Sequence, residues 1–178
     1  MHRSENVIQE AAVLVPVFRG KDGDLLVVLV RRTDGGVHGG QIAFPGGKRD
    51  EGDASLLDTA LREAREEIGL DPSAVTVLEV LPVIDTITTG FRIHPFLARV
   101  TPPPIWRPDP REVAEIIEMK VAGLLDPAAH GAEVWSFPEW PAPRRVRFIR
   151  VGGHKLWGAT YRILHPLLPR IVSGEWEF

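Results

Sequence analysis

The apolar residues of this 178-residue chain fall into short runs of the kind that form β-hairpins. Residues 11–18 and 25–30 are rich in Val and Leu and flank a turn cluster at 20–24, which predicts a first hairpin. A second hairpin is predicted for 75–84 and 91–100. Further strands are expected at 42–44 and 145–151, while 112–119 fits a strand or a helix.

One segment, residues 55–68, has a strong helical pattern. Its apolar residues recur at helical spacing and form one face, with Ser55 as a plausible N-cap and Gly69 as a plausible stop. A short helix is expected at 122–126 and a terminal one at 157–171, broken by Pro166 and Pro169. Hairpins combined with two packed helices predict an α/β fold in which a sheet lies between helices.

Composition narrows the class of protein without naming a function. The length suits one domain spanning 1–178, and we find no internal repeat and no linker. The chain has no cysteine, which excludes disulfides, thiolate metal sites and cysteine nucleophiles. A net charge of −3 gives no signal for nucleic acid. No apolar run approaches the ~20 residues that span a bilayer, so we expect no membrane partner and a cytoplasmic protein.

The predicted helix at 55–68 also carries a crowded acidic edge. Glu63, Glu66 and Glu67 stand at i, i+3 and i+4, so their side chains are neighbours and repel one another. From Asp50 to Glu67 there are seven acids and two bases. A bound hard cation such as Mg²⁺ would explain this cluster. A solvated helix face with i,i+4 ion pairs would explain it too.

The same region resembles the signature of the Nudix hydrolases. The residues that match are Arg62, Glu63, Ala64, Glu66, Glu67, Gly69 and Leu70. The first half departs from the signature, because its acid is Asp53 rather than glutamate and the spacer to Arg62 is one residue longer. The segment from His38 to Gly47 resembles the lead-in of the coenzyme A diphosphatase branch, although residues 32–38 are one residue shorter and lack its Leu-Arg.

This resemblance implies a fold, a cofactor and a set of site residues. The fold would be a Nudix-like α/β/α sandwich with a mixed β-sheet, with a strand at 112–119, and the cofactor Mg²⁺ or Mn²⁺. Glu63 and Glu67 would be metal ligands, Glu66 a third ligand or the base that activates water, and Arg62 would hold the glutamates in place. Glu112 is the candidate for a later acidic ligand. Gly46 and Gly47 would let the backbone pass close to the helix and the phosphates.

The implied substrate is a nucleotide-derived diphosphate. Cleavage of coenzyme A or its thioesters would give 4′-phosphopantetheine and adenosine 3′,5′-bisphosphate. The alternatives are ADP-ribose, NADH or another nucleoside diphosphate linked to a second group, and a non-catalytic nucleotide-binding module. The oligomeric state stays open, a homodimer included. Candidate substrate contacts are Arg31, Arg32, His38 and Gln41, and a basic cluster at 144–150 fits either a docking patch or an exposed strand face.

Overall fold

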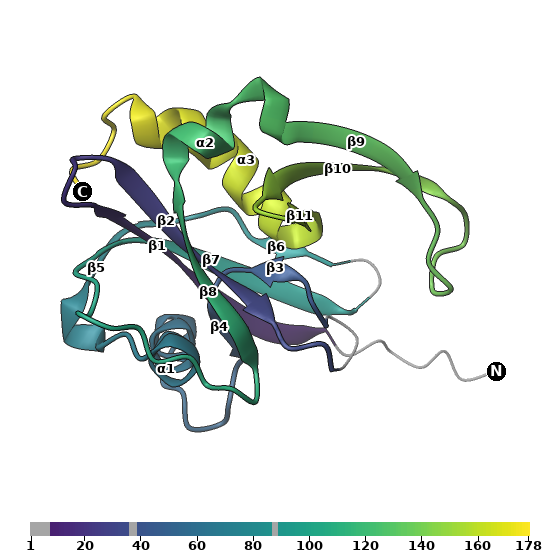
Figure 1. Cartoon of the computed structure of the whole chain (residues 1–178). Coiled ribbons are helices and arrows are strands. Elements are labelled where there is room, and N and C mark those ends of the chain that lie inside the picture. Colours follow the sequence, from purple (N-terminus) through teal and green to yellow (C-terminus); the bar gives the residue numbers. More distant parts are fainter. Residues whose placement is uncertain (1–7, 36–38, 87–88) are drawn as a thin grey trace.

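A mixed β-sheet forms the centre of the molecule in the computed structural model, which describes residues 8–35, 39–86 and 89–178 (Figure 1). The strand order is β3-β2-β1-β7-β5, with β4 on β1, β6 on β7 and β8 on β2. β1 and β7 run parallel, whereas the other pairs are antiparallel. The strands are β1 Gln9–Arg19, β2 Leu25–Arg32, β3 Ile42–Ala43, β4 Gly46–Lys48, β5 Val75–Val80, β6 Ile84–Asp85, β7 Phe91–Val100 and β8 Val113–Lys120.

Both predicted hairpins are present. β1 and β2 pair antiparallel across the turn at 20–24, and β5 pairs antiparallel with β7. The strand expected at 75–84 is wrong in one respect: β5 ends at Val80 and pairing resumes only at β6. Pro82 lies in the interruption, where it has no N–H to donate to a ladder. Residues 113–120 form a strand, which decides the choice left open by the sequence.

Helix α1, Leu56–Ile68, covers one face of the sheet. The Ser55 side chain accepts a hydrogen bond from the Asp58 N–H, and Gly69 ends the helix at φ 71°. Both predicted boundaries are confirmed. Ala60, Ala64 and Ile68 pack in one buried cluster with apolar residues of β1 and β2.

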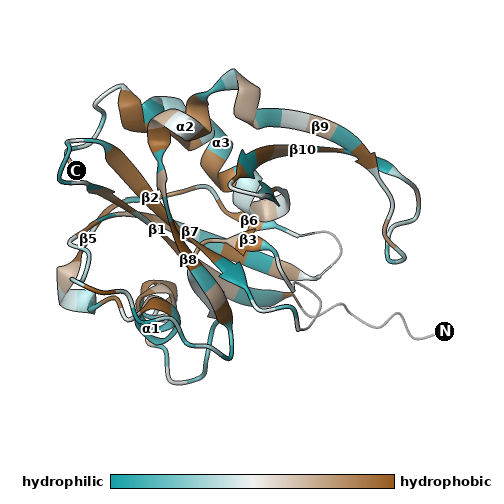
Figure 2. Cartoon of the chain, in the orientation of Figure 1, coloured by the Kyte–Doolittle hydropathy of each residue, from teal (hydrophilic) through white to brown (hydrophobic). Residues whose placement is uncertain are grey.

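The opposite face is covered by helices and by a second, three-stranded sheet (Figure 1). The elements are α2 Val121–Leu125, β9 His130–Trp135, β10 Arg144–Val151, β11 His154–Leu156 and α3 Gly158–Val172, with a 3₁₀ turn at Pro127–Ala129. Another 3₁₀ turn, Pro72–Ala74, follows α1 on the first face. Figure 2 shows hydrophobic segments concentrated along β1 and β2, between the layers. The predicted α/β/α sandwich with a mixed sheet is confirmed.

The predicted break in the terminal helix is wrong. α3 runs without interruption through Pro166 and Pro169. Both prolines lie on its exposed side, while Leu164, Leu167 and Leu168 are buried against the core. The carbonyl oxygens that lose a partner at each proline therefore lie towards water, and packing of the apolar face holds the helix together. None of the helices in the described residues is long and apolar enough to cross a bilayer.

Candidate active site

The acidic edge of α1 lies directly against the glycines of β4. The Gly46 N–H donates a 2.9 Å hydrogen bond to Glu67 Oε2. At Gly47 a Cβ atom would stand 2.5 Å from Glu63 Oε1, so only glycine leaves room for that carboxylate. β4 is held in this position because it pairs with β1. The two predicted glycines therefore allow the close approach of strand and helix that the sequence indicated.

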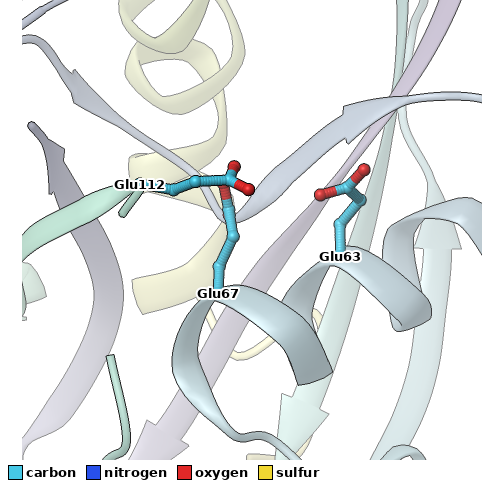
Figure 3. Close-up of side chains that lie close together, drawn as sticks. All are labelled: Glu63, Glu67 and Glu112. Carbon is cyan, nitrogen blue, oxygen red and sulfur yellow. The ribbon is translucent and has the colours of Figure 1, made fainter. Parts of the chain in front are cut away.

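Three carboxylates come together beside these glycines: Glu63 and Glu67 from α1, and Glu112 from the residue before β8 (Figure 3). One oxygen of each lies within 4.8 Å of the others. The Asp109 N–H donates to the Glu67 carbonyl, and the Thr33 N–H donates to the Glu112 carbonyl. These backbone bonds tie the loop before β8 to both α1 and the end of β2.

Glu66 does not join this group. Its side chain is 58% exposed, and its Oε2 accepts a 3.1 Å hydrogen bond from Arg62 Nη1. The two glutamates that follow one another on the helix thus face different surroundings, since Glu67 is only 2% exposed.

Arg62 is the fixed cation of the site. Asp53 accepts from its Nε and Nη2 at 2.9 and 3.0 Å. Its Nη1 also donates to Glu63 at 3.0 Å, and its Nη2 donates to the Lys48 carbonyl at 3.1 Å. The predicted role of Arg62, holding the glutamates by charge-assisted hydrogen bonds, agrees with these contacts.

Asp53 has a part in the site that the sequence did not assign. Besides Arg62, it accepts hydrogen bonds from Thr59 Oγ1 at 2.8 Å and from the Asp50 N–H at 2.9 Å. The Arg62 guanidinium holds the pKa of this carboxyl well below its usual range. The signal that could have found this role is the place of Asp53 in the motif. The shorter aspartate and the longer spacer together still bring a carboxylate onto Arg62.

Comparison with known proteins gives the family. The sequence matches the NUDIX domain over residues 8–139, which is more than half of the chain. The chain belongs to the Nudix family. Relatives described as "Uncharacterized Nudix hydrolase NudL", from Salmonella paratyphi B and Salmonella newport, are each 38% identical over 164 residues, covering 92% of this chain and 83% of theirs.

Solved structures show the same fold. The Nudix hydrolase RenU of M. smegmatis has a TM-score of 0.65 and 19% identity over 96% of this chain and 89% of its own. The NUDIX domain of Shewanella oneidensis NrtR, complexed with ADP ribose, has a TM-score of 0.52 and 21% identity over 66% of this chain and 75% of its own.

The present protein is a Nudix hydrolase that acts on the pyrophosphate bond of a nucleoside diphosphate derivative.

Burial opposes ionisation of the two inner glutamates of this Nudix hydrolase. Burial raises the pKa of Glu67 to about 7, although the Gly46 N–H and Arg32 favour its charged form. Burial likewise raises the pKa of Glu63, against the lowering effect of Arg62. A cation placed between these carboxylates would favour the charged form of both.

The donor set fits the divalent metals that Nudix hydrolases generally use. Carboxylate oxygens are hard ligands, preferred by Mg²⁺ and Mn²⁺ over nitrogen or sulfur. Glu112 is exposed, so the group of three opens to solvent and to substrate, while Glu67 is anchored from behind by Gly46. Three carboxylates on two fixed backbone segments, helix α1 and the loop before β8, therefore offer a cation a partly preformed site.

Of the candidate substrate contacts that the structure describes, one lies beside the acidic group and the others have different partners. Arg32 Nη1 lies 3.7 Å from Glu67 Oε1, at the edge of the acidic group. Arg31 turns to other acids, Glu115 at 3.5 Å and Asp34 at 3.7 Å. The backbone carbonyl of Gln41 accepts a hydrogen bond from the Arg32 N–H, which ties residue 41 to the end of β2. His38 lies outside the described residues.

The basic segment near the C-terminus lies away from the glutamates, on the second sheet. Arg144 lies over the Trp140 ring and Arg150 over the Phe148 ring. Trp157 packs among Trp135, Phe137 and Trp140. On the residues described, these arginines and this tryptophan stabilise the β9–β10 hairpin by ring packing.

Proposed function

We propose that this Nudix hydrolase cleaves the diphosphate of coenzyme A or its thioesters in a reaction that requires Mg²⁺ or Mn²⁺. The single observation that carries the metal requirement is the meeting of Glu63, Glu67 and Glu112 beside Gly46 and Gly47. The choice of coenzyme A is supported by the resemblance of the segment 38–47 to the coenzyme A diphosphatase branch.

The proposed roles follow from the contacts. Glu63, Glu67 and Glu112 hold the metal, and Arg62 keeps Glu63 in place. The exposed Glu66 remains the candidate for a further ligand or for the base that takes a proton from water. When bound, the cation would neutralise the diphosphate and polarise its phosphoryl oxygens. Arg32, at the edge of the site, and the close approach at Gly46 and Gly47 would orient the phosphates.

The domain and the assembly are part of the same proposal. We propose that residues 1–178 form one domain, because β1 and β2 share a buried apolar cluster with β10 and α3, which lie beyond the matched residues 8–139. We further propose a cytoplasmic enzyme that binds small molecules rather than nucleic acid. Light scattering of the purified chain would decide between a monomer and a homodimer.

The substrate is tested by comparing rates side by side. Coenzyme A, acetyl-coenzyme A, ADP-ribose, NADH and ATP are incubated with the protein and Mg²⁺ or Mn²⁺, and the products are identified by mass spectrometry. We expect coenzyme A or its thioester to be cleaved fastest and EDTA to abolish turnover. Faster cleavage of ADP-ribose or NADH would favour the second candidate, which the short glycine-rich segment 33–37 supports. Tight nucleotide binding without turnover would favour a binding module.

The proposed ligand just before β8, Glu112, has a matched control three residues away. Glu112→Gln removes a carboxylate from the metal group, and we expect the rate to fall about 10- to 100-fold. Glu115→Gln removes the same charge from a side chain that pairs with Arg31, and we expect little change. Equal rates for the two variants would exclude Glu112 from the metal site.

A further inference from the structure

The two arginines beside the glutamates are held very differently. Arg62 is fixed by the bidentate hydrogen bond to Asp53 and by the Lys48 carbonyl. Arg32 contacts Glu67 at 3.7 Å, longer than a hydrogen bond. No other carboxylate of the described residues lies within ion-pair distance of Arg32. Its guanidinium can therefore leave without breaking any side-chain hydrogen bond that the described residues show.

The position of Arg32 is set by its strand. Val28 and Val30 of β2 are buried on the α1 side of the sheet, and Arg32 continues this alternation. Its backbone is bonded at both ends, because the N–H donates to the Gln41 carbonyl and the carbonyl accepts from the Gly40 N–H. The side chain alone is free to move.

Arg32 lies beside the Glu67 oxygen that is open to a metal. Glu67 Oε2 is taken by the Gly46 N–H at 2.9 Å, so Oε1 is the oxygen left to bind a cation. Arg32 Nη1 lies nearest to that same Oε1. A carboxylate that is 2% exposed is costly to ionise without a positive charge beside it. In the metal-free enzyme the Arg32 guanidinium supplies that charge.

We propose that Arg32 is an exchangeable counter-cation, which neutralises Glu67 in the metal-free enzyme and is displaced when a divalent cation binds. The inference rests on the proposed metal site. Displacement would also release the guanidinium towards the diphosphate, whose oxygens it can bind in a bidentate way. Metal binding and substrate binding would then be coupled through one side chain.

The test is the affinity for Mn²⁺, measured by isothermal titration calorimetry on the full chain. In Arg32→Gln the metal has no cation to displace, and we expect the Kd to fall about tenfold, equivalent to about 1.4 kcal/mol. Arg31→Gln removes the same charge from the neighbouring residue, whose partners are Glu115 and Asp34. In that variant we expect the Kd to change by less than about threefold.

The outcomes separate this inference from the proposed function. If the wild-type chain binds no Mn²⁺, the metal site and the exchange are both refuted. If the wild-type chain binds Mn²⁺ but Arg32→Gln has an unchanged or larger Kd, only the exchange is refuted. A larger Kd in Arg32→Gln would make Arg32 a residue that positions Glu67.

A measurement on the wild-type chain covers the case in which Arg32→Gln does not fold. The Nε–Hε signals of Arg32 and Arg62 are followed by NMR during Mg²⁺ titration, after assignment with Arg32→Lys. We expect the Arg32 signal to shift and to exchange faster with water as Mg²⁺ saturates the site. The Arg62 signal should persist, since Asp53 holds its Nε. An Arg32 signal that does not respond to Mg²⁺ would refute the exchange.

Discussion

The two faces of the central sheet are covered by different chemistry. On the α1 face the helix packs through Ala60 and Ala64, and the three buried polar or charged side chains of the described residues, Asp53, Thr59 and Glu67, all lie there. On the opposite face α3 buries aliphatic side chains, among them Leu164 and Leu168. The same sheet thus carries one face with buried charged side chains and one face whose buried side chains, among the described residues, are all apolar.

This difference separates function from stability. Buried acids lower the stability of the α1 face unless each finds a partner, and here the partners are the Gly46 N–H, Arg62 and Arg32. The α3 face has no such requirement and contributes the apolar burial that holds the fold. Substitutions on the first face should therefore affect activity most, and those on the second should affect unfolding most.

The largest effect is expected for Glu67→Gln, which removes the innermost carboxylate of the α1 face. Hydrolysis should fall on the order of 10³-fold, corresponding to about 4 kcal/mol of activation free energy. The rate of substrate hydrolysis at saturating Mg²⁺ measures this loss. Activity that stays within a factor of two of the wild type would show that Glu67 binds no metal.

The same variant has an expected pH signature without metal. Burial raises the pKa of Glu67 from 4.5 to about 7, so the folded state binds this proton more tightly than the unfolded state does. The wild-type chain should therefore lose stability as the pH rises from about 5 to 8, and Glu67→Gln should lose less. Thermal unfolding in EDTA at pH 5.5 and pH 8 compares the two proteins.

On the α3 face the largest expected effect is on unfolding. Leu164 is fully buried, and Leu164→Ala should lower the free energy of unfolding by about 2–5 kcal/mol. Urea unfolding gives this value, and kcat per folded molecule should stay within about twofold of the wild type. A large loss of kcat at unchanged Mn²⁺ affinity would show that the two faces are coupled.

Asp53→Asn should lower both the hydrolysis rate and the free energy of unfolding, because Asp53 is buried and holds Arg62 in the site. We expect a loss of roughly 1–3 kcal/mol of stability at pH 7, since Arg62 loses its charged partner. Because Arg62 lowers the pKa of Asp53 below 3.8, the wild-type stabilisation is present above pH 4 and disappears as the pH falls further. The difference between the two proteins in urea unfolding should shrink accordingly towards pH 3.

The control for Asp53→Asn is a second partner of Arg62. Asp50 is 70% exposed and lies 3.6 Å from the guanidinium, so Asp50→Asn should change stability little. Equal losses of stability in the two variants would mean that the bidentate contact of Asp53 stabilises the fold no more than the exposed contact of Asp50.

The smallest effect is expected for Gly47→Ala. The new methyl group would meet the end of the Glu63 side chain, which can turn aside with the loss of one hydrogen bond from Arg62, so stability should change by about 1 kcal/mol or less. The displaced carboxylate should weaken Mn²⁺ binding about threefold, equivalent to about 0.6 kcal/mol. Gly52→Ala, where no atom lies near the new methyl group, is the control for calorimetry. Unchanged Mn²⁺ affinity in Gly47→Ala would place Glu63 outside the metal group.

The sequence by itself determined the local features of this protein. Periodicity and capping residues placed α1 between Ser55 and Gly69, and the apolar runs placed the two hairpins, because these patterns reflect contacts between residues close along the chain. The motif also marked the acidic edge of α1. Signals of this kind failed at α3, where the prolines suggested a break but burial of one apolar face outweighed the lost hydrogen bonds.

Only the tertiary structure decided which acidic side chains lie together and which arginines contact them. Glu112 reaches Glu63 and Glu67 because β8 pairs with β2 and the loop before it is bonded to α1, and no local pattern encodes that distance. The same holds for the place of Arg32 beside Glu67, because the two residues are far apart in the sequence. Sequence spacing fixes the neighbours within one helix, whereas an electrostatic site depends on segments that pairing and packing bring together from far along the chain.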